Sequence, residues 1–366
     1  MKRRRWRWLL LLPALYAVAL PFLNACAGPL RVEPLRQVTR PPVVDRHLEL
    51  ARAYAPWILH ESHPTKGRQD LPAPVDFDGD LYGRNNWDNF PYFELVPTVY
   101  YAVLETPTHW FLSYHLFQPR DWAGLDLGLH QTHENDGENL QVVVSRGSGA
   151  VVLLFTQAHF RGRVYAGPAG GIAGAAVRIR GDVLLVDGGG RPSAQGRHPV
   201  VFVESGGHGI FGLRDSDARA ALAPAGGVEF ARHGYVLRPA QDGEGVREPR
   251  LLAGVIPYRL ESTTARLWPL LRSGELAGDG CLLDRAVPYR DARVAIGVPR
   301  YYESDRFSGP LGPDRGISPF ALDFGFRAPD LGSLFFDPAR RYAECLEVSE
   351  PWSLEYVDYP FSTRDG

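Results

Sequence analysis

The stretch Ser113–Val144 reads SYHLFQPRDWAGLDLGLHQTHENDGENLQVVV. Two apolar runs, Trp110–Phe117 and Leu140–Val144, overlap or lie within this stretch, and apolar residues recur in them at alternate positions. An alternation of period two is typical of half-buried strands. Between the runs lies a long polar connection. The stretch therefore predicts two stiff strands that hold a polar loop.

Short β-branched or aromatic runs of the same kind recur through the middle of the chain, divided by turns rich in glycine. The predicted strands are Val96–Glu105, Trp110–Phe117, Leu140–Arg146, Val151–Ala158, Ala175–Arg180, Val183–Val186 and Val200–Glu204. The 39 glycines and 31 prolines suit a loop-rich β architecture. We therefore expect an all-β fold from about Val96 to Val236: an antiparallel two-sheet β-sandwich, similar to a jelly roll, with long loops and a few peripheral helices.

Helix signals occur in three segments outside this region. His47–Ile58 has a helical pattern, Ser262–Leu271 begins with a hydroxyl residue, and Pro338–Leu346 begins with a proline at its first turn. Neither an internal repeat nor a clear boundary divides the later chain. We expect residues 46–366 to form a single elaborated β-sandwich domain.

Composition limits the possible partners. The chain has 366 residues, of which 45% are hydrophobic and 22% charged, so it can bury a sizeable core. Its formal net charge is −2, and no basic stripe follows the first residues. Because nucleic-acid binding needs a basic surface, nucleic acid is not an expected partner.

The amino terminus predicts export. Residues 1–26 contain a basic start, an apolar core from Leu9 to Leu23, and the sequence Leu-Asn-Ala-Cys ending at Cys26. This order is typical of a signal peptide, and its end is similar to a bacterial lipobox with Cys26 as the lipidated residue. Residues 27–45 are rich in proline and predict an extended tether. We expect a lipid-anchored protein of the cell envelope; a plain cleaved signal or an uncleaved anchor remains the alternative.

Two cysteines follow Cys26, namely Cys281 and Cys345. An even number in an oxidising compartment predicts a disulfide between them. The alternative is two buried free thiols, which applies if the two sites are distant in space.

The polar loop of the opening stretch has the composition of a cation site. One imidazole and two carboxylates fall within six residues, and a further aspartate ends the preceding strand. The candidate ligands are Asp121, His133, Asp136 and Glu138. Carboxylates with one imidazole and no thiolate suit a hard divalent ion such as Mg²⁺, Ca²⁺ or Mn²⁺. The alternative is a solvated loop with ordinary turn-forming residues.

A second acidic cluster comprises Asp76, Asp78 and Asp80, with Gly79 between the last two. Alternating aspartates around a glycine resemble a calcium-binding turn. The twelfth position counted from Asp76 is Trp87, where an EF-hand requires a glutamate, so an EF-hand is excluded. A possible second metal site and a hydrogen-bonded turn both remain open.

The pattern Tyr-x-x-Phe-x-Pro-Arg-Asp, followed by His-x-x-Asp-x-Glu and a β-rich run, resembles the necrosis-inducing, Nep-like cytolysins. The family signature is Pro-Lys-Asp with His-Arg-His-Asp-Trp-Glu. The segments YAPWILH, FDGD with NNW, and HPVVFVESGGHG resemble the related vacuolar protein sorting 62 family. These resemblances span about residues 54–211 and imply that the family's metal ligands fall on the same four residues. Gly137 and Asn135 replace the family's Trp and second His, and the gap after Asp121 is longer.

Three classes of function follow from these features. The first is an exported binding module that uses a divalent cation to recognise a glycan or a lipid headgroup. The second is a metal-dependent hydrolase, with His208 or Glu134 as proton carrier; the resemblance places a histidine at the position of His208 beside the metal. The third is a membrane-damaging effector, which a lipid anchor disfavours. The chain has no G-x-S-x-G motif, so serine hydrolysis is disfavoured. Sequence leaves open whether the chain is an enzyme.

Overall fold

The computed structural model describes residues 35–121, 133–158, 161–168, 170–175, 178–213, 234–273, 275, 301–302, 332–349 and 351–361. The predicted signal segment with Cys26 lies outside these residues, and so does Cys281. The predicted lipidation and the predicted disulfide therefore stay predictions. Cys345 is buried at the end of a helix. No helix in the described ranges is long and apolar enough to span a membrane.

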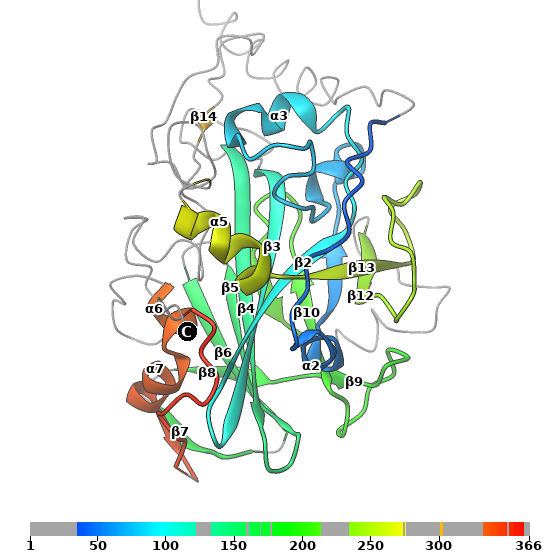
Figure 1. Ribbon diagram of the computed structural model, residues 1–366. Helices are drawn as coiled ribbons and strands as arrows, with labels where there is room; N and C mark the ends of the chain where they lie inside the picture. The colour runs from blue at the N-terminus through cyan, green and yellow to red at the C-terminus, as the bar shows by residue number, and fades with distance from the viewer. Residues whose placement is uncertain are drawn as a thin grey trace, which may run out of the picture.

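The fold is built on a single mixed sheet of 13 strands (Figure 1). Its main path runs in the order β11-β10-β1-β12-β13-β2-β3-β4-β5-β6-β8, while β9 pairs with β10 and β14 pairs with β4. The strands are β1 Trp57–Glu61, β2 Thr98–Glu105, β3 His109–Asp121, β4 His133–Ser145, β5 Val151–Ala158, β6 Arg161–Ala166, β8 Ile179–Asp182, β9 Leu185–Val186, β10 His198–Val203, β11 Ile210–Gly212, β12 Gly234–Pro239, β13 Val255–Ser262 and β14 Tyr301–Tyr302. A separate pair joins β7 Ile172–Ala175 to β15 Leu346–Val348.

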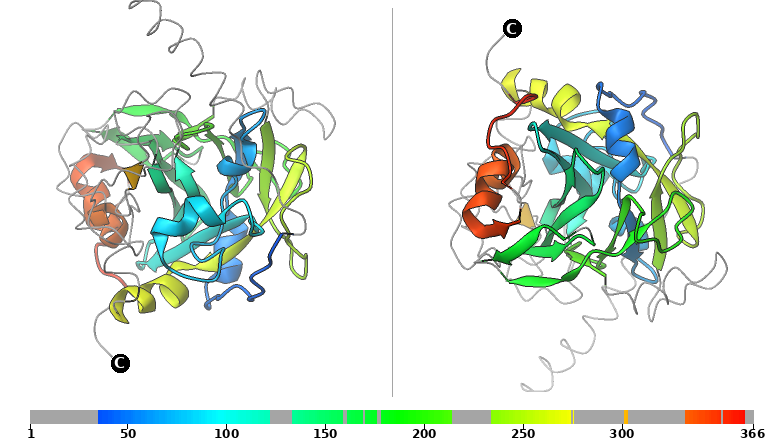
Figure 2. Two further views of the ribbon diagram at one scale, coloured as in Figure 1. Left: turned by 90° about the horizontal axis from the view of Figure 1, so that it is seen from above. Right: turned by 90° about the horizontal axis from the view of Figure 1, so that it is seen from below.

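The sheet curls into a half-barrel (Figure 2). Its first strand, β11, packs closely against β6 near the other end of the path: a Cβ atom at Gly212 would lie 2.6 Å from a ring carbon of Tyr165. Only glycine allows so close an approach. The curl brings residues from both ends of the sheet order to one interior.

The expected two-sheet antiparallel sandwich is wrong. The run from β2 to β6 is antiparallel, as predicted. However, β1 pairs in parallel with β10, β12 with β13, and β13 with β2. The alternation of residues suggested two sheets, and these parallel pairings join them into one. Periodicity reports which residues are half-buried along a strand, whereas it carries no information on which distant strand becomes the neighbour.

Local signals placed most of the individual elements. The predicted strand Val96–Glu105 corresponds to β2, and Val151–Ala158 is β5 itself. Predicted helix His47–Ile58 ends earlier: α2 covers Leu48–Tyr54, and β1 begins at Trp57. The reason is Pro56, which disfavours helical backbone at the residue before it.

Both predicted carboxy-terminal helices are present. Ser262 accepts a hydrogen bond from Ala265 N and so caps a π-helical turn, η3 Thr263–Leu267, which continues into α5 Trp268–Ser273. Helix α7 covers Pro338–Cys345, with its proline in the first turn. The remaining short helices are η1 Gly67–Asp70, η2 Gly83–Asn85, α3 Asn86–Asn89 and α6 Gly332–Phe336.

Two hydrophobic cores lie on opposite faces of the strands β3 to β5. On one face, Leu116 and Leu140 belong to the large core inside the half-barrel. On the other face, Phe111 and Phe155 pack with α6 and α7 in a second core. Because side chains alternate across a strand, each face has its own set of residues, and the candidate site extends the inner set.

Residues 35–45, at the end of the predicted tether, lie along the folded body. The backbone N–H of Arg36 donates to Tyr92 O, and Glu94 N donates to Arg36 O. Arg40 pairs with Asp76 and Glu261. This part of the segment is therefore held by hydrogen bonds and ion pairs.

Candidate functional site

The candidate site begins on the outer half of β4, where Asp136 and Glu138 are two residues apart. Residues at this spacing lie on the same face of a strand, and both side chains are buried, with 6% and 3% of their surface exposed. Across the hairpin, Gln118 is the partner of Asp136 and Leu116 is the partner of Glu138. The polar pair thus continues the inner face whose next residue, Leu140, belongs to the hydrophobic core.

Asn135 has a left-handed backbone, with φ of 58°. This conformation is uncommon for a residue other than glycine. The pairing of β3 with β4 keeps one register across Asn135, from Gln118 with Asp136 to Asp121 with His133. The Asn135 side chain donates to Gly83 O at 3.0 Å and accepts from Asn86, which holds the unusual backbone in place.

The structure brings His208 to these carboxylates from the turn between β10 and β11. Its φ is 53°, the only positive value besides that of Asn135 among the described residues other than glycine. Its Nδ1 lies 2.8 Å from Asp136 Oδ2, and its Nε2 lies 3.3 Å from Asp70 Oδ1. The ring is fully buried between the two carboxylates. Backbone strain concentrated at two residues of one cluster is typical of functional sites.

Asp70 anchors the other side of the ring. It lies at the end of η1 and accepts hydrogen bonds from the backbone N–H groups of His63 and Gly206, both at 2.9 Å. It also accepts from Ser205 Oγ at 3.1 Å. Asp70 therefore holds the turn that carries His208 against the loop that follows β1, and no sequence motif pointed to it.

Charge settles the protonation state of His208. Burial by itself would lower the pKa of its ring, but the hydrogen bonds and charges of Asp136 and Asp70 raise this pKa to about 10. Burial would likewise raise the pKa of Asp70, and the His208 imidazolium lowers it below the usual value. His208 is thus a cation at neutral pH. It is suited to hold Asp136 in place and poorly suited to accept a proton.

A second histidine of the interior, His60 on β1, has the opposite character. It is fully buried, and its ring stacks on Tyr235 of β12 at a centroid distance of 5.1 Å. It meets His208 edge-on at 6.3 Å. Burial lowers the pKa of His60 to about 4. His60 is not among the residues predicted from sequence; the available signal was an imidazole that follows the apolar run Trp57–Leu59.

Two further polar residues complete the inner set. Gln118 and Thr156 are fully buried on β3 and β5. Within the described part of the chain, the side-chain amide of Gln118 has no hydrogen-bond partner at its nitrogen or its oxygen. Thr156 Oγ1 has none there either. A glutamine at a core position after Tyr114 and Leu116 breaks the apolar alternation, which is a signal that sequence reasoning missed. We call this set the polar belt: His60, Asp70, Gln118, Asp136, Glu138, Thr156 and His208.

The other predicted ligands lie further along the hairpin. Asp121 and His133 are partners across β3 and β4, and the side chains of His133 and Glu134 lie outside the described set. Three acidic or imidazole ligand atoms within 4.8 Å of one another occur in one described group only, His47, Glu105 and Asp358. The described carboxylates of the predicted set therefore do not meet this distance criterion by themselves.

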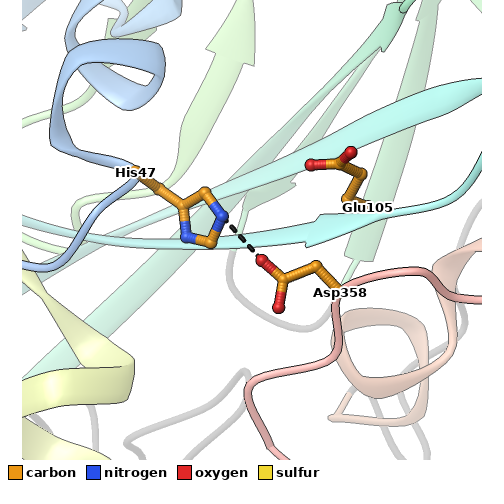
Figure 3. A group of neighbouring side chains, drawn as sticks. All are labelled: His47, Glu105 and Asp358. Carbon is orange, nitrogen blue, oxygen red and sulfur yellow. Dashed lines mark ion pairs between the residues drawn. The ribbon is translucent and has the colours of Figure 1, made fainter.

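The group of His47, Glu105 and Asp358 already contains its own counter-charges (Figure 3). His47 Nε2 lies 2.7 Å from Asp358 Oδ2, and Arg46 also pairs with this carboxylate. Arg146 Nη2 lies 2.7 Å from Glu105 Oε1. The pairs with Asp358 join the carboxy-terminal segment to the start of α2, and the pair of Arg146 joins β2 to the turn between β4 and β5, so the group has a structural role.

The second predicted cluster is held by arginines. Asp76 receives two hydrogen bonds from Arg40, at 2.8 and 2.6 Å, and one from Arg266 at 2.6 Å. Asp78 accepts from Asn89, and Asp80 from Asn85. The three aspartates thus face different partners and do not form a described metal-ligand group. The hydrogen-bonded turn describes this segment better than a cation site.

Comparisons with known proteins find neither a matching family model nor a matching curated protein. Solved structures of the necrosis-inducing toxin fold match part of the chain. One described as a toxin fold for microbial attack and plant defense is 15% identical, with a TM-score of 0.30, over 50% of this chain and 76% of the other. Necrosis and Ethylene inducing Protein 2, from the causal agent of cocoa's Witches Broom disease, is 15% identical, with a TM-score of 0.29, over 51% of this chain and 76% of the other. NLPPya in complex with mannosamine is 15% identical, with a TM-score of 0.29, over 50% of this chain and 76% of the other.

Proposed function

We propose that this chain is an exported binding protein that holds a divalent cation at the outer end of the β3–β4 hairpin and uses it to recognise a glycan or a lipid headgroup. One observation carries the proposal. Asp136 and Glu138 are buried side by side on the inner face of β4, directly beside Gln118, a buried amide without a hydrogen-bond partner in the described chain.

The donor set fits a hard cation. Two carboxylates and an amide oxygen are ligands that Mg²⁺, Ca²⁺ and Mn²⁺ prefer. Asp136 and Glu138 would hold the ion, with the amide oxygen of Gln118 as a third donor. The predicted ligands Asp121 and His133 pair with each other three residues further along the same hairpin. A cation bound there would supply positive charge that attracts hydroxyl or phosphate oxygens.

His208 acts on this site as a positioning residue. Its protonated ring donates to Asp136, and Asp70 holds the far side of the ring. Groups that orient a metal-binding carboxylate in this way contribute to affinity without touching the ion. The hydrolase alternative has less support, because a histidine with a pKa near 10 does not accept a proton at neutral pH.

The test is calorimetric titration of Mg²⁺, Ca²⁺ and Mn²⁺ into the wild type and Glu138→Gln. Glu138 is preferable to Asp136 because it has no hydrogen bond to His208 among those described. We expect the variant to bind its best ion at least about tenfold more weakly. Asp80→Asn, an exposed acid of the arginine-held cluster, is the matched control and should bind as the wild type does. Equal ion affinities in the wild type and Glu138→Gln would show that the carboxylates of this hairpin do not bind a cation.

Sugar binding follows as a second measurement. The solved complexes with mannosamine and glucosamine concern other proteins, and these sugars serve here only as convenient probes. We expect amino-sugar binding to need the cation, so that chelation abolishes it. Amino-sugar binding that is unchanged by chelator would show that the protein recognises the sugar without the ion.

The cell-envelope location is part of the proposal and rests on residues 1–26. Export with lipidation at Cys26 predicts that the protein fractionates with membranes. Cys26→Ser should release it or block its processing. Unchanged processing and fractionation of this variant would contradict lipidation and leave export open.

A further inference from the structure

The ring of His60 has a defined tautomer. Its Nδ1 lies 2.7 Å from the backbone oxygen of Glu61. A carbonyl oxygen can only accept a hydrogen bond, so Nδ1 must carry the proton that it donates. The stack on Tyr235 fixes the plane of the ring, and the orientation of Nε2 is fixed with it.

The same ring is neutral at physiological pH. It is fully buried, which lowers its pKa to about 4. A neutral imidazole protonated at Nδ1 has a lone pair at Nε2. Within the described residues this atom has no hydrogen-bond partner. His60 therefore offers a buried acceptor of fixed direction, which is costly to leave unsatisfied.

The position of this acceptor connects it to the polar belt. Ile58, two residues earlier on β1, belongs to the inner core, so His60 lies on the inner face of the sheet. Its ring is next to that of His208, which contacts Asp136. Within the described residues, side-chain atoms of Gln118 and Thr156 in the belt likewise have no hydrogen-bond partner.

We infer that His60 Nε2 accepts a hydrogen bond from the ligand of the proposed site, and that the donor is a hydroxyl or an amine of the ligand. This inference rests on the proposed binding function and narrows it. An unprotonated Nε2 gains nothing from the oxygens of a phosphodiester anion, which only accept, whereas a sugar hydroxyl or amine donates to it. His60 thus selects the glycan over the phosphate part of a lipid headgroup.

The test compares His60→Phe with His109→Phe. Phenylalanine keeps an aromatic ring for the stack on Tyr235 and removes Nε2. His109 is a matched control because it is also buried, with its pKa lowered to about 4, and its ring lies 4.4 Å from that of Trp352 in the other core. The probes are glucosamine and dimethyl phosphate, a phosphodiester with no donor, titrated with saturating Mg²⁺, Ca²⁺ or Mn²⁺ and again with chelator.

We expect glucosamine to bind His60→Phe at least about tenfold more weakly than the wild type. His109→Phe should bind glucosamine normally, and both variants should keep the wild-type affinity for the ion. Loss of ion binding in Glu138→Gln with no effect of His60→Phe on glucosamine would overturn this inference and leave the proposed function standing. Glucosamine binding that needs His60 and no cation would overturn the proposed function and leave this inference standing.

A measurement on the wild type covers the case in which His60→Phe does not fold. In protein labelled with ¹⁵N-histidine, glucosamine should shift the Nε2 resonance of His60, because this nitrogen gains a hydrogen bond, while dimethyl phosphate should leave it unchanged. A resonance that does not move at saturating glucosamine, a wild type that binds dimethyl phosphate in preference, or a wild type that binds neither probe would each overturn the inference.

Discussion

The chain contains two acidic clusters that look alike in sequence and differ in their surroundings. Asp76 lies between the guanidinium groups of Arg40 and Arg266, which hold it by three hydrogen bonds. Asp136 lies beside Glu138 and receives a hydrogen bond from His208. Both aspartates are buried to a similar degree, each with 6% of its surface exposed. Burial alone therefore does not distinguish a structural carboxylate from a candidate ligand.

The difference lies in the charges that surround each carboxylate. Burial by itself would raise the pKa of Asp76, yet the hydrogen bonds and charges of Arg40 and Arg266 lower it. A divalent ion entering this cluster would have to displace permanently charged arginines, which form planar bidentate contacts. At Asp136 the neighbours include a second carboxylate, an amide and the imidazolium of His208, whose Nδ1 lies 2.8 Å from Oδ2. The comparison predicts that stability depends mainly on the first cluster and cation binding on the second.

The strongest way to break this comparison is Asp76→Asn. The substitution removes the shared partner of two partly buried arginines, and breaking such a pair typically costs about 3 kcal/mol or more of unfolding free energy. Denaturant unfolding measures this loss, and titration should find cation affinity unchanged. Asp80→Asn is the control, because this exposed residue should change stability by less than about 0.5 kcal/mol. A cation affinity that falls with Asp76→Asn would show that the first cluster takes part in ion binding.

His208→Gln should have the next largest effect. Glutamine keeps one hydrogen bond to a carboxylate but loses the positive charge between Asp70 and Asp136, so we expect a loss of about 2 kcal/mol. His109→Gln is the control, since no ion pair of His109 is among those described. Equal losses in the two variants would mean that the charge between the aspartates contributes nothing, and that packing of the ring accounts for the effect.

Asp78→Asn should have the smallest effect, and it should stabilise the protein. Burial raises the pKa of Asp78 to about 6, from the usual 3.8 of an aspartate. Between these pH values the folded state holds a proton that the unfolded state has lost, so the unfolding free energy falls as pH rises through this window. Above it, Asp78 is ionised at a cost that asparagine does not incur. We expect Asp78→Asn to gain on the order of 1 kcal/mol near neutral pH.

The pH dependence sharpens that prediction. The gain from Asp78→Asn should shrink below about pH 6 and vanish near pH 4, since the wild-type carboxyl is then protonated in both states. Melting curves of both proteins across this range provide the measurement. A gain that is the same at every pH would assign the effect to the hydrogen bond with Asn89 and not to the charge.

Part of the candidate site could be read from the sequence because it is local. Asp136 and Glu138 were identified as candidate ligands from their residue types and close spacing in a stretch predicted as a polar loop. Their common face follows from the structure, in which β4 begins at His133 and not at Leu140. His208 was recognised in its glycine-rich turn. Asp70 carries no local signal, and His60 has only its place after an apolar run; nothing around either residue indicates that it reaches the same interior as Asp136. The role expected of His208 also changed, because only its two carboxylate neighbours reveal that it keeps its proton.

The sequence by itself determined the apolar parts of strands β2 to β5, the helices that begin at Ser262 and Pro338, and the residue types available for a cation. These features depend on neighbouring residues along the chain, through alternation, capping and the backbone limits of proline. Tertiary structure alone decided that β1, β12 and β13 join the two halves into one sheet. It also decided that arginines neutralise Asp76, while His208 and Gln118 surround Asp136. Strand partners and counter-charges come from segments far apart in sequence, and their choice depends on the free energy of the whole packed fold.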